Sequence, residues 1–111
     1  MQIIHVDSLE DKRLHAYINL TEVQLRNRLE PDEGIFIAES PKVIDRALAA
    51  DREPLSFLVE EAWLEGMRST FELVDARWGM NIPVFVASEA LLKQLTGYRL
   101  HRGAMCAMRR W

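Results

Sequence analysis

The stretch from Gly34 to Leu48, which reads GIFIAESPKVIDRAL, decides the fold that the sequence predicts. Residues 35–38 are continuously apolar, which is typical of a strand covered on both faces in a parallel sheet. Ser40 stands where a helix takes its N-cap oxygen, and Pro41 suits the first helical position, where its missing N–H is no loss. Apolar side chains then recur at helical spacing, at Val43, Ile44, Ala47 and Leu48. The stretch therefore predicts a strand that turns directly into an amphipathic helix.

Strand-like and helix-like segments alternate along the rest of the chain. Strands are expected at residues 55–59, 81–87 and 104–108, and helices at residues 60–64, at residues 69–78 and after Ser88. The run from Ser69 to Glu72 reads as a capping box, and Gly79 ends the helix that it opens. This order predicts an α/β fold, a three-layer α/β/α sandwich with a mostly parallel (mixed) four-stranded sheet and helices on both faces.

Residues 1–30 are predicted to form an N-terminal helical arm that packs on an α/β domain of residues 31–111. The arm begins with a short β-prone run, Met1–Val6, and continues with helical patterns at residues 11–18 and 21–29. Thr21 and Gln24 have the spacing of a capping box and would open the second of these helices.

Length and composition indicate one ordinary globular domain, with 111 residues, 49% apolar and 28% charged. Because the chain has no long apolar run and no signal-peptide pattern, we expect a cytoplasmic protein that does not enter a membrane. The single cysteine, Cys106, has no partner for an intrachain disulfide, and no Cys/His set has metal-ligand spacing.

Charge is distributed unevenly along the chain, although the formal net charge is only −3. Residues 90–111 hold five basic residues and no acidic one, whereas the rest of the chain holds nine basic and 17 acidic residues. A basic carboxyl-terminal end on an acidic body is compatible with a localised RNA-facing edge. Chance accumulation of arginines in short loops explains the charge alone equally well.

No residue constellation in the sequence supports catalysis by this chain. Cys106 lies inside an apolar run, where a small buried thiol is inert, and His101 stands in a basic loop next to Arg102. Neither a dinucleotide-binding glycine motif nor a P-loop is present, so no cofactor is expected in this chain.

Several short motifs, in this order, resemble a known family. They are Leu14-x-x-Tyr17, Leu20-Thr21, Leu25-Arg26, residues 34–39, residues 43–48, residues 84–92, residues 95–97 and residues 101–104. Together they resemble the N-terminal substrate-binding domain of SpoU (TrmH-type) RNA 2′-O-ribose methyltransferases, in the form common in actinobacteria.

The resemblance implies a fold similar to that of the ribosomal proteins that bind kink-turn RNA. It also implies a following knotted domain, absent from this chain, that binds S-adenosylmethionine, methylates tRNA or rRNA and forms a homodimer. The fragment alone would then be non-catalytic and monomeric, and Arg109–Trp111 would begin the linker. Family members commonly have Gly where this chain has Ser40, which together with Pro41 stiffens the first turn.

The residues that we predict to contact RNA come from the second helix of the arm, the first turn and the basic loop before the last strand. They are Arg26, Arg28, Glu39, Ser40, Lys42, Arg102 and Gly103. The arginines and the lysine would meet phosphates, and Gly103 would allow close approach of the RNA. In the fold that the resemblance implies, the basic loop reaches the same edge as the first turn. The alternative is a protein-interaction domain that does not bind RNA and docks a partner through its acidic body.

Overall fold

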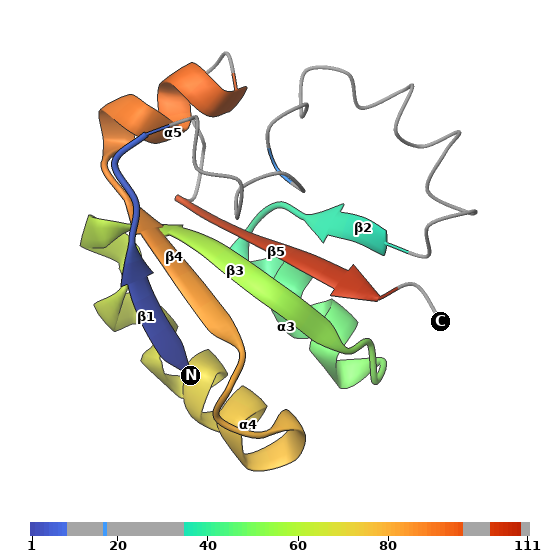
Figure 1. Cartoon of the computed structure of the whole chain (residues 1–111). Helices are drawn as coiled ribbons and strands as arrows, with labels where there is room; N and C mark the ends of the chain where they lie inside the picture. Colours follow the sequence, from blue (N-terminus) through green and yellow to red (C-terminus); the bar gives the residue numbers. More distant parts are fainter. Residues whose placement is uncertain (9–16, 18–34, 97–102, 110–111) are drawn as a thin grey trace.

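The computed structural model describes residues 1–8, 17, 35–96 and 103–109 (Figure 1). The strands are β1 (Gln2–His5), β2 (Ile35–Ala38), β3 (Pro54–Glu60), β4 (Pro83–Ala87) and β5 (Ala104–Arg109). The helices are α3 (Pro41–Ala49), α4 (Arg68–Trp78) and α5 (Glu89–Thr96), and two 3₁₀ turns, Glu61–Trp63 and Glu65–Met67, lead from β3 into α4. None of the described helices has the length and apolar character needed to cross a membrane.

The described residues form a mixed sheet of five strands, in the order β1-β4-β3-β5-β2, rather than the four strands expected. The fifth strand is β1, which lies in the segment expected as an arm and pairs in parallel with β4, Ile3 opposite Val84. Parallel pairing also joins β4 to β3, but β5 runs antiparallel to both of its neighbours. The sheet is therefore mixed, as expected, without being mostly parallel. Residues 18–30 lie outside the described part of the chain, and the helical arm stays a prediction.

Strand β2 has the predicted bounds but a different place from the one expected. It is an edge strand, and it pairs antiparallel with β5, Ile35 opposite Arg109 and Ala38 opposite Cys106. Continuous apolar character misled the prediction because it reports cover on the two faces of a strand and not the direction of its neighbours. Ile37 packs on one face of the sheet and Ala38 is buried on the other, so both faces are covered even at the edge.

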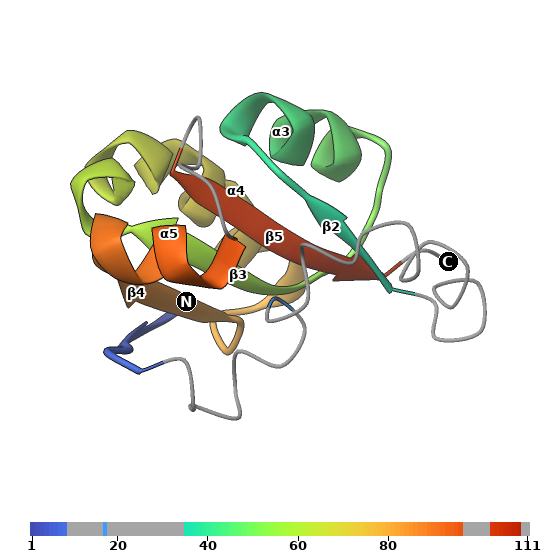
Figure 2. The same cartoon turned by 90° about the horizontal axis from the view of Figure 1, so that it is seen from above.

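Two hydrophobic layers hold the helices on opposite faces of the sheet, as the three-layer arrangement predicts. Helices α3 and α4 cover one face (Figure 2), where the rings of Phe57 and Phe71 meet edge to face with centroids 5.2 Å apart. On the other face, Leu92 of α5 and Tyr17 pack with Leu58 from the centre of the sheet. The buried face of α3 is narrower than the apolar pattern predicts, because Ile44 and Leu48 are buried but Val43 is 44% exposed.

Three of the predicted helix boundaries are confirmed, two by serine side-chain caps and one by a glycine. The Ser40 side chain accepts from the N–H of Val43 at 3.2 Å, and Ser88 Oγ accepts from the N–H of Leu91 at 3.1 Å. Gly79 follows α4 with a φ of 94°, a conformation that favours glycine.

The capping box expected at Ser69–Glu72 is wrong, because α4 already begins at Arg68. The 3₁₀ turn Glu65–Met67 runs directly into the helix and supplies the turn before it, so no side-chain cap is used. The helix expected at residues 60–64 is likewise reduced to the 3₁₀ turn Glu61–Trp63.

Candidate nucleic-acid interface

Turns from three parts of the chain meet at one end of the sheet, at the upper left of β5 in Figure 1. Strands β2 and β3 end here, whereas β5 begins here because it is antiparallel to both. Val59 lies opposite Ala104, and the N–H of Glu60 donates to the carbonyl of Gly103 at 2.7 Å. We call residues 39–42, 60–63 and 103 together the candidate edge.

The β2–α3 turn contributes three of the residues predicted to contact RNA. Glu39 and Lys42 are exposed, while Ser40 is half-buried and holds the start of α3 through its Oγ. Lys42 lies in the first turn of α3, where the unpaired N–H groups of the helix create a partial positive charge. Ser40 therefore has a structural role at this turn, and Lys42 is its exposed cation.

Gly103 has a different neighbour from the one that the sequence suggested. Its φ is +62°, and a Cβ added there would lie 2.3 Å from Cδ1, 2.6 Å from Nε1 and 2.9 Å from Cγ of Trp63. Glycine is therefore needed because the indole of Trp63 approaches the backbone closely, and the space beside Gly103 is filled by protein. Trp63 itself is 37% exposed.

The described charges of the candidate edge are mixed. The exposed cation Lys42 shares its turn with Glu39, while Glu60 ends β3 and Glu61 follows it. The described turns alone are thus not a strongly positive surface. Three of the predicted RNA-binding residues, Arg26, Arg28 and Arg102, lie outside the described residues.

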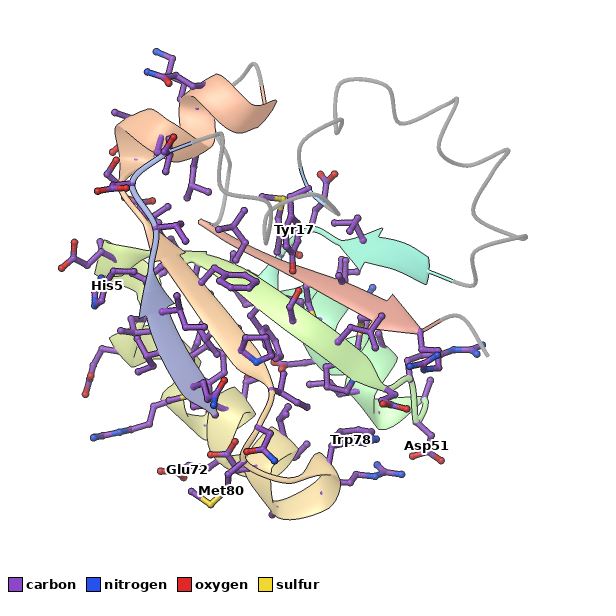
Figure 3. The ribbon with its side chains drawn as sticks, viewed as in Figure 1. His5, Tyr17, Asp51, Glu72, Trp78 and Met80 are labelled. Atoms are coloured by element: carbon purple, nitrogen blue, oxygen red, sulfur yellow. The ribbon has the colours of Figure 1, made fainter. Side chains whose placement is uncertain are left out.

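The two described groups whose pKa is raised by burial, Tyr17 and Cys106, belong to the core. The hydroxyl of Tyr17 (Figure 3) donates to the carbonyl of Ser56 at 3.0 Å and accepts from the N–H of Ala107 at 3.1 Å. The pairing register of β3 and β5 shifts between Pro54 and Ser56, and the Tyr17 hydroxyl forms hydrogen bonds with backbone groups of both strands near this shift. Burial raises the pKa of the Cys106 thiol, as expected for an inert core cysteine, and burial also raises the pKa of Tyr17.

A second surface feature is a groove of about 330 Å³ between α3 and α4, away from the candidate edge. Thr70 Oγ1 donates to Asp45 Oδ1 across it at 2.9 Å, and Leu73 on its wall is 51% exposed. At one end Arg77 pairs with Asp51, near Trp78 (Figure 3). Sequence reasoning missed this groove because its walls come from two helices whose packing no local pattern specifies.

Among the described residues, no cluster of His, Cys, Asp and Glu could hold a metal ion.

Comparison with known proteins gives relatives of one kind. The chain is 30% identical over 101 residues to uncharacterized tRNA/rRNA methyltransferases of Mycobacterium bovis and of Mycobacterium tuberculosis. The alignment covers 91% of this chain but 33% of each relative, so the chain spans about a third of the length of the curated relatives it matches. No family model matches the chain.

Solved structures agree with these relatives at the level of the fold. An AdoMet-bound rRNA methyltransferase from Sinorhizobium meliloti superposes with a TM-score of 0.68 at 14% identity, over 100% of this chain and 38% of that chain. An RNA 2′-O ribose methyltransferase superposes with a TM-score of 0.66 at 24% identity, over 97% of this chain and 38% of that one. The resemblance to RNA methyltransferases read from the sequence motifs is thus confirmed by both sequence and fold.

Proposed function

We propose that this chain is the RNA-substrate-binding domain of an S-adenosylmethionine-dependent RNA 2′-O-ribose methyltransferase of the SpoU (TrmH) type, and that it is not catalytic by itself. The observation that carries the proposal is the extent of the alignment, nearly all of this chain with a third of each tRNA/rRNA methyltransferase. The remaining two thirds of each relative are long enough to form a separate catalytic domain.

The proposal divides the work between two parts of one protein. This part would hold tRNA or rRNA in the manner of the kink-turn-binding ribosomal proteins, and the knotted part would bind the cofactor and form the homodimer. The chemistry of this chain is compatible with that division, since its single thiol, Cys106, is buried with a raised pKa. Alone, the chain would be monomeric and cytoplasmic.

The candidate edge would meet RNA chiefly through phosphate contacts. Lys42 lies at the positive end of α3, and Arg102 precedes Gly103 directly in the sequence. Arg26 and Arg28, which the sequence analysis also predicted to contact RNA, would add further phosphate contacts. Since so few cations take part, we expect weak binding with a strong dependence on salt.

The test measures binding of a fluorescently labelled kink-turn RNA hairpin, by anisotropy, at several salt concentrations. The variant Lys42→Glu/Arg102→Glu should bind at least about ten-fold more weakly, with the salt slope lowered by about two, one for each lost phosphate contact. The matched control is Arg46→Glu/Lys93→Glu, which reverses two charges, as the test variant does, at exposed positions in the last turns of α3 and α5.

Unchanged affinity and slope in a variant that remains folded would contradict the RNA-binding role. The protein-interaction alternative would then be favoured, and the groove between α3 and α4, with Leu73 exposed on its wall, is the surface that favours it. A plain duplex of equal length, bound as tightly as the kink-turn hairpin, would contradict the likeness to the kink-turn proteins alone.

A further inference from the structure

Trp63 lies at the candidate edge, where Gly103 contacts its ring and part of its surface is exposed to solvent. It ends the 3₁₀ turn that follows β3, and the buried backbone of Gly103 lies against its ring. The position of a Cβ on Gly103 is 2.3 Å from Cδ1, and the two ring atoms that flank Cδ1 are only slightly further, at 2.6 and 2.9 Å. Gly103 therefore lies over the face of the five-membered ring and not beyond its edge.

The contact with Gly103 fixes the ring before any ligand arrives. The carbonyl of Gly103 accepts from the N–H of Glu60 at 2.7 Å, so the backbone under the ring is tied to the end of β3. Trp63 nevertheless keeps 37% of its surface exposed, although tryptophan is highly buried on average. An aromatic ring held on one face and open to solvent loses little conformational entropy when a second flat group stacks on it.

The other described tryptophan does not offer such a surface. Trp78, the last residue of α4 (labelled in Figure 3), is half-buried and packs against the core that α3 and α4 cover. The guanidinium carbon of Arg77 lies 4.8 Å from the centre of the Trp78 ring, so that ring already has a cation on its face.

We propose that Trp63 is a stacking platform for one unpaired RNA base, at the same end of the sheet as Lys42. The inference rests on the proposed function and adds a base-contacting residue to it. Carboxylates flank Trp63 in the sequence, at Glu61 and Glu65, and both are exposed. Glu65 forms an ion pair with Arg68 at 3.4 Å, whereas Glu61 disfavours a phosphate beside the ring, so the group proposed to stack there is an uncharged base.

Stacking of this kind predicts the type of RNA feature that the domain selects. Every base has a π-face, so the platform tolerates any base but requires that the base be unpaired, as in a bulge or loop. The domain should therefore distinguish RNA with a splayed base from a continuous duplex, with little preference for sequence at that position.

The test uses an RNA hairpin with 2-aminopurine at each loop position in turn, together with hairpins abasic at those positions. Trp63→Leu should weaken binding by about ten-fold, while Trp63→Phe should retain most of the affinity, because base–aromatic stacking contributes about 1–3 kcal/mol per base. At one loop position the parent protein should quench 2-aminopurine and Trp63→Leu should not. The hairpin that is abasic at that position should bind the parent and Trp63→Leu equally.

Circular dichroism and urea unfolding of each variant establish that it is folded before binding is compared. If Lys42→Glu/Arg102→Glu weakens binding but folded Trp63→Leu binds as the parent does, the platform is wrong and the RNA-binding function stands. Failure of the parent protein to bind any of the hairpins would overturn both. Equal loss in Trp63→Leu for intact and abasic hairpins would also overturn the platform, because the loss would then not involve a base.

Discussion

At the scale of single residues, Gly103 and Trp63 act as one unit. The positive φ of Gly103 and the indole over its Cα leave no room for another side chain, since an added Cβ would lie 2.3 Å from the ring. The sequence analysis expected RNA to approach Gly103, whereas in the structure the indole of Trp63 lies against it. No local pattern links residues forty positions apart, so the sequence did not indicate the contact between Gly103 and Trp63.

Changing Gly103 to Ala should destabilise the domain, because alanine is strained at this φ and its Cβ collides with the ring. We expect a loss of about 1–3 kcal/mol in the free energy of unfolding, measured by urea denaturation. Trp63→Ala/Gly103→Ala should lose less than the sum of the two single changes, since removal of the indole removes the collision. Strict additivity would show that the two residues do not touch.

Two buried groups predict how stability depends on pH. Burial raises the pKa of Cys106 above 9.0 and that of Tyr17 above 10.0, so the folded chain keeps protons that the unfolded chain releases. Their contribution is therefore complete below about pH 9 and is lost as the pH rises through the raised values. Urea unfolding between pH 7 and 10.5 should show the free energy of unfolding falling above about pH 9.

A matched variant separates the two groups. Cys106→Ala removes the thiol, so the fall should begin about one pH unit higher, where tyrosine ionises in the unfolded chain. A free energy of unfolding that stays constant to pH 10.5 would mean that neither group is shielded from solvent as the structure indicates.

At the scale of elements, local chemistry predicted what is local. The oxygen caps of Ser40 and Ser88 and the terminal Gly79 mark helix ends in the structure as in the sequence. The edge position of β2 and the addition of β1 to the sheet depend on pairing between segments far apart in the chain, which periodicity does not report. The groove and the Trp63 contact are missing from the sequence reading for the same reason.

The two serine caps predict comparable losses on truncation. Ser40→Ala and Ser88→Ala should each lower the free energy of unfolding by about 0.5–2 kcal/mol, because each leaves a helix N–H without its side-chain acceptor. Ser40→Gly, the residue common in the family that the chain resembles, should lose only a few tenths. Urea denaturation of the three variants gives the comparison, and a Ser40→Ala loss no larger than that of Ser40→Gly would contradict the capping role.

At the scale of the whole molecule, we expect that this chain alone does not bind S-adenosylmethionine. The expectation follows from the proposed division of work, in which the cofactor belongs to a separate part of the protein. Titration calorimetry of the chain with the cofactor should give only heats of dilution. Saturable one-to-one binding would contradict the proposal that this domain is not catalytic by itself.

The position of β5 also determines when β2 can join the sheet during synthesis of the protein. The strand formed by Ala104–Arg109 lies between β3 and β2, and its antiparallel pairing is what joins β2 to the described sheet. Ribosomes synthesise β2 and α3 long before this strand, so the β2 backbone leaves the ribosome without its neighbour in the sheet. Because an unpaired apolar strand is prone to aggregate, a chaperone has its longest opportunity to act on this protein between the synthesis of residues 38 and 104.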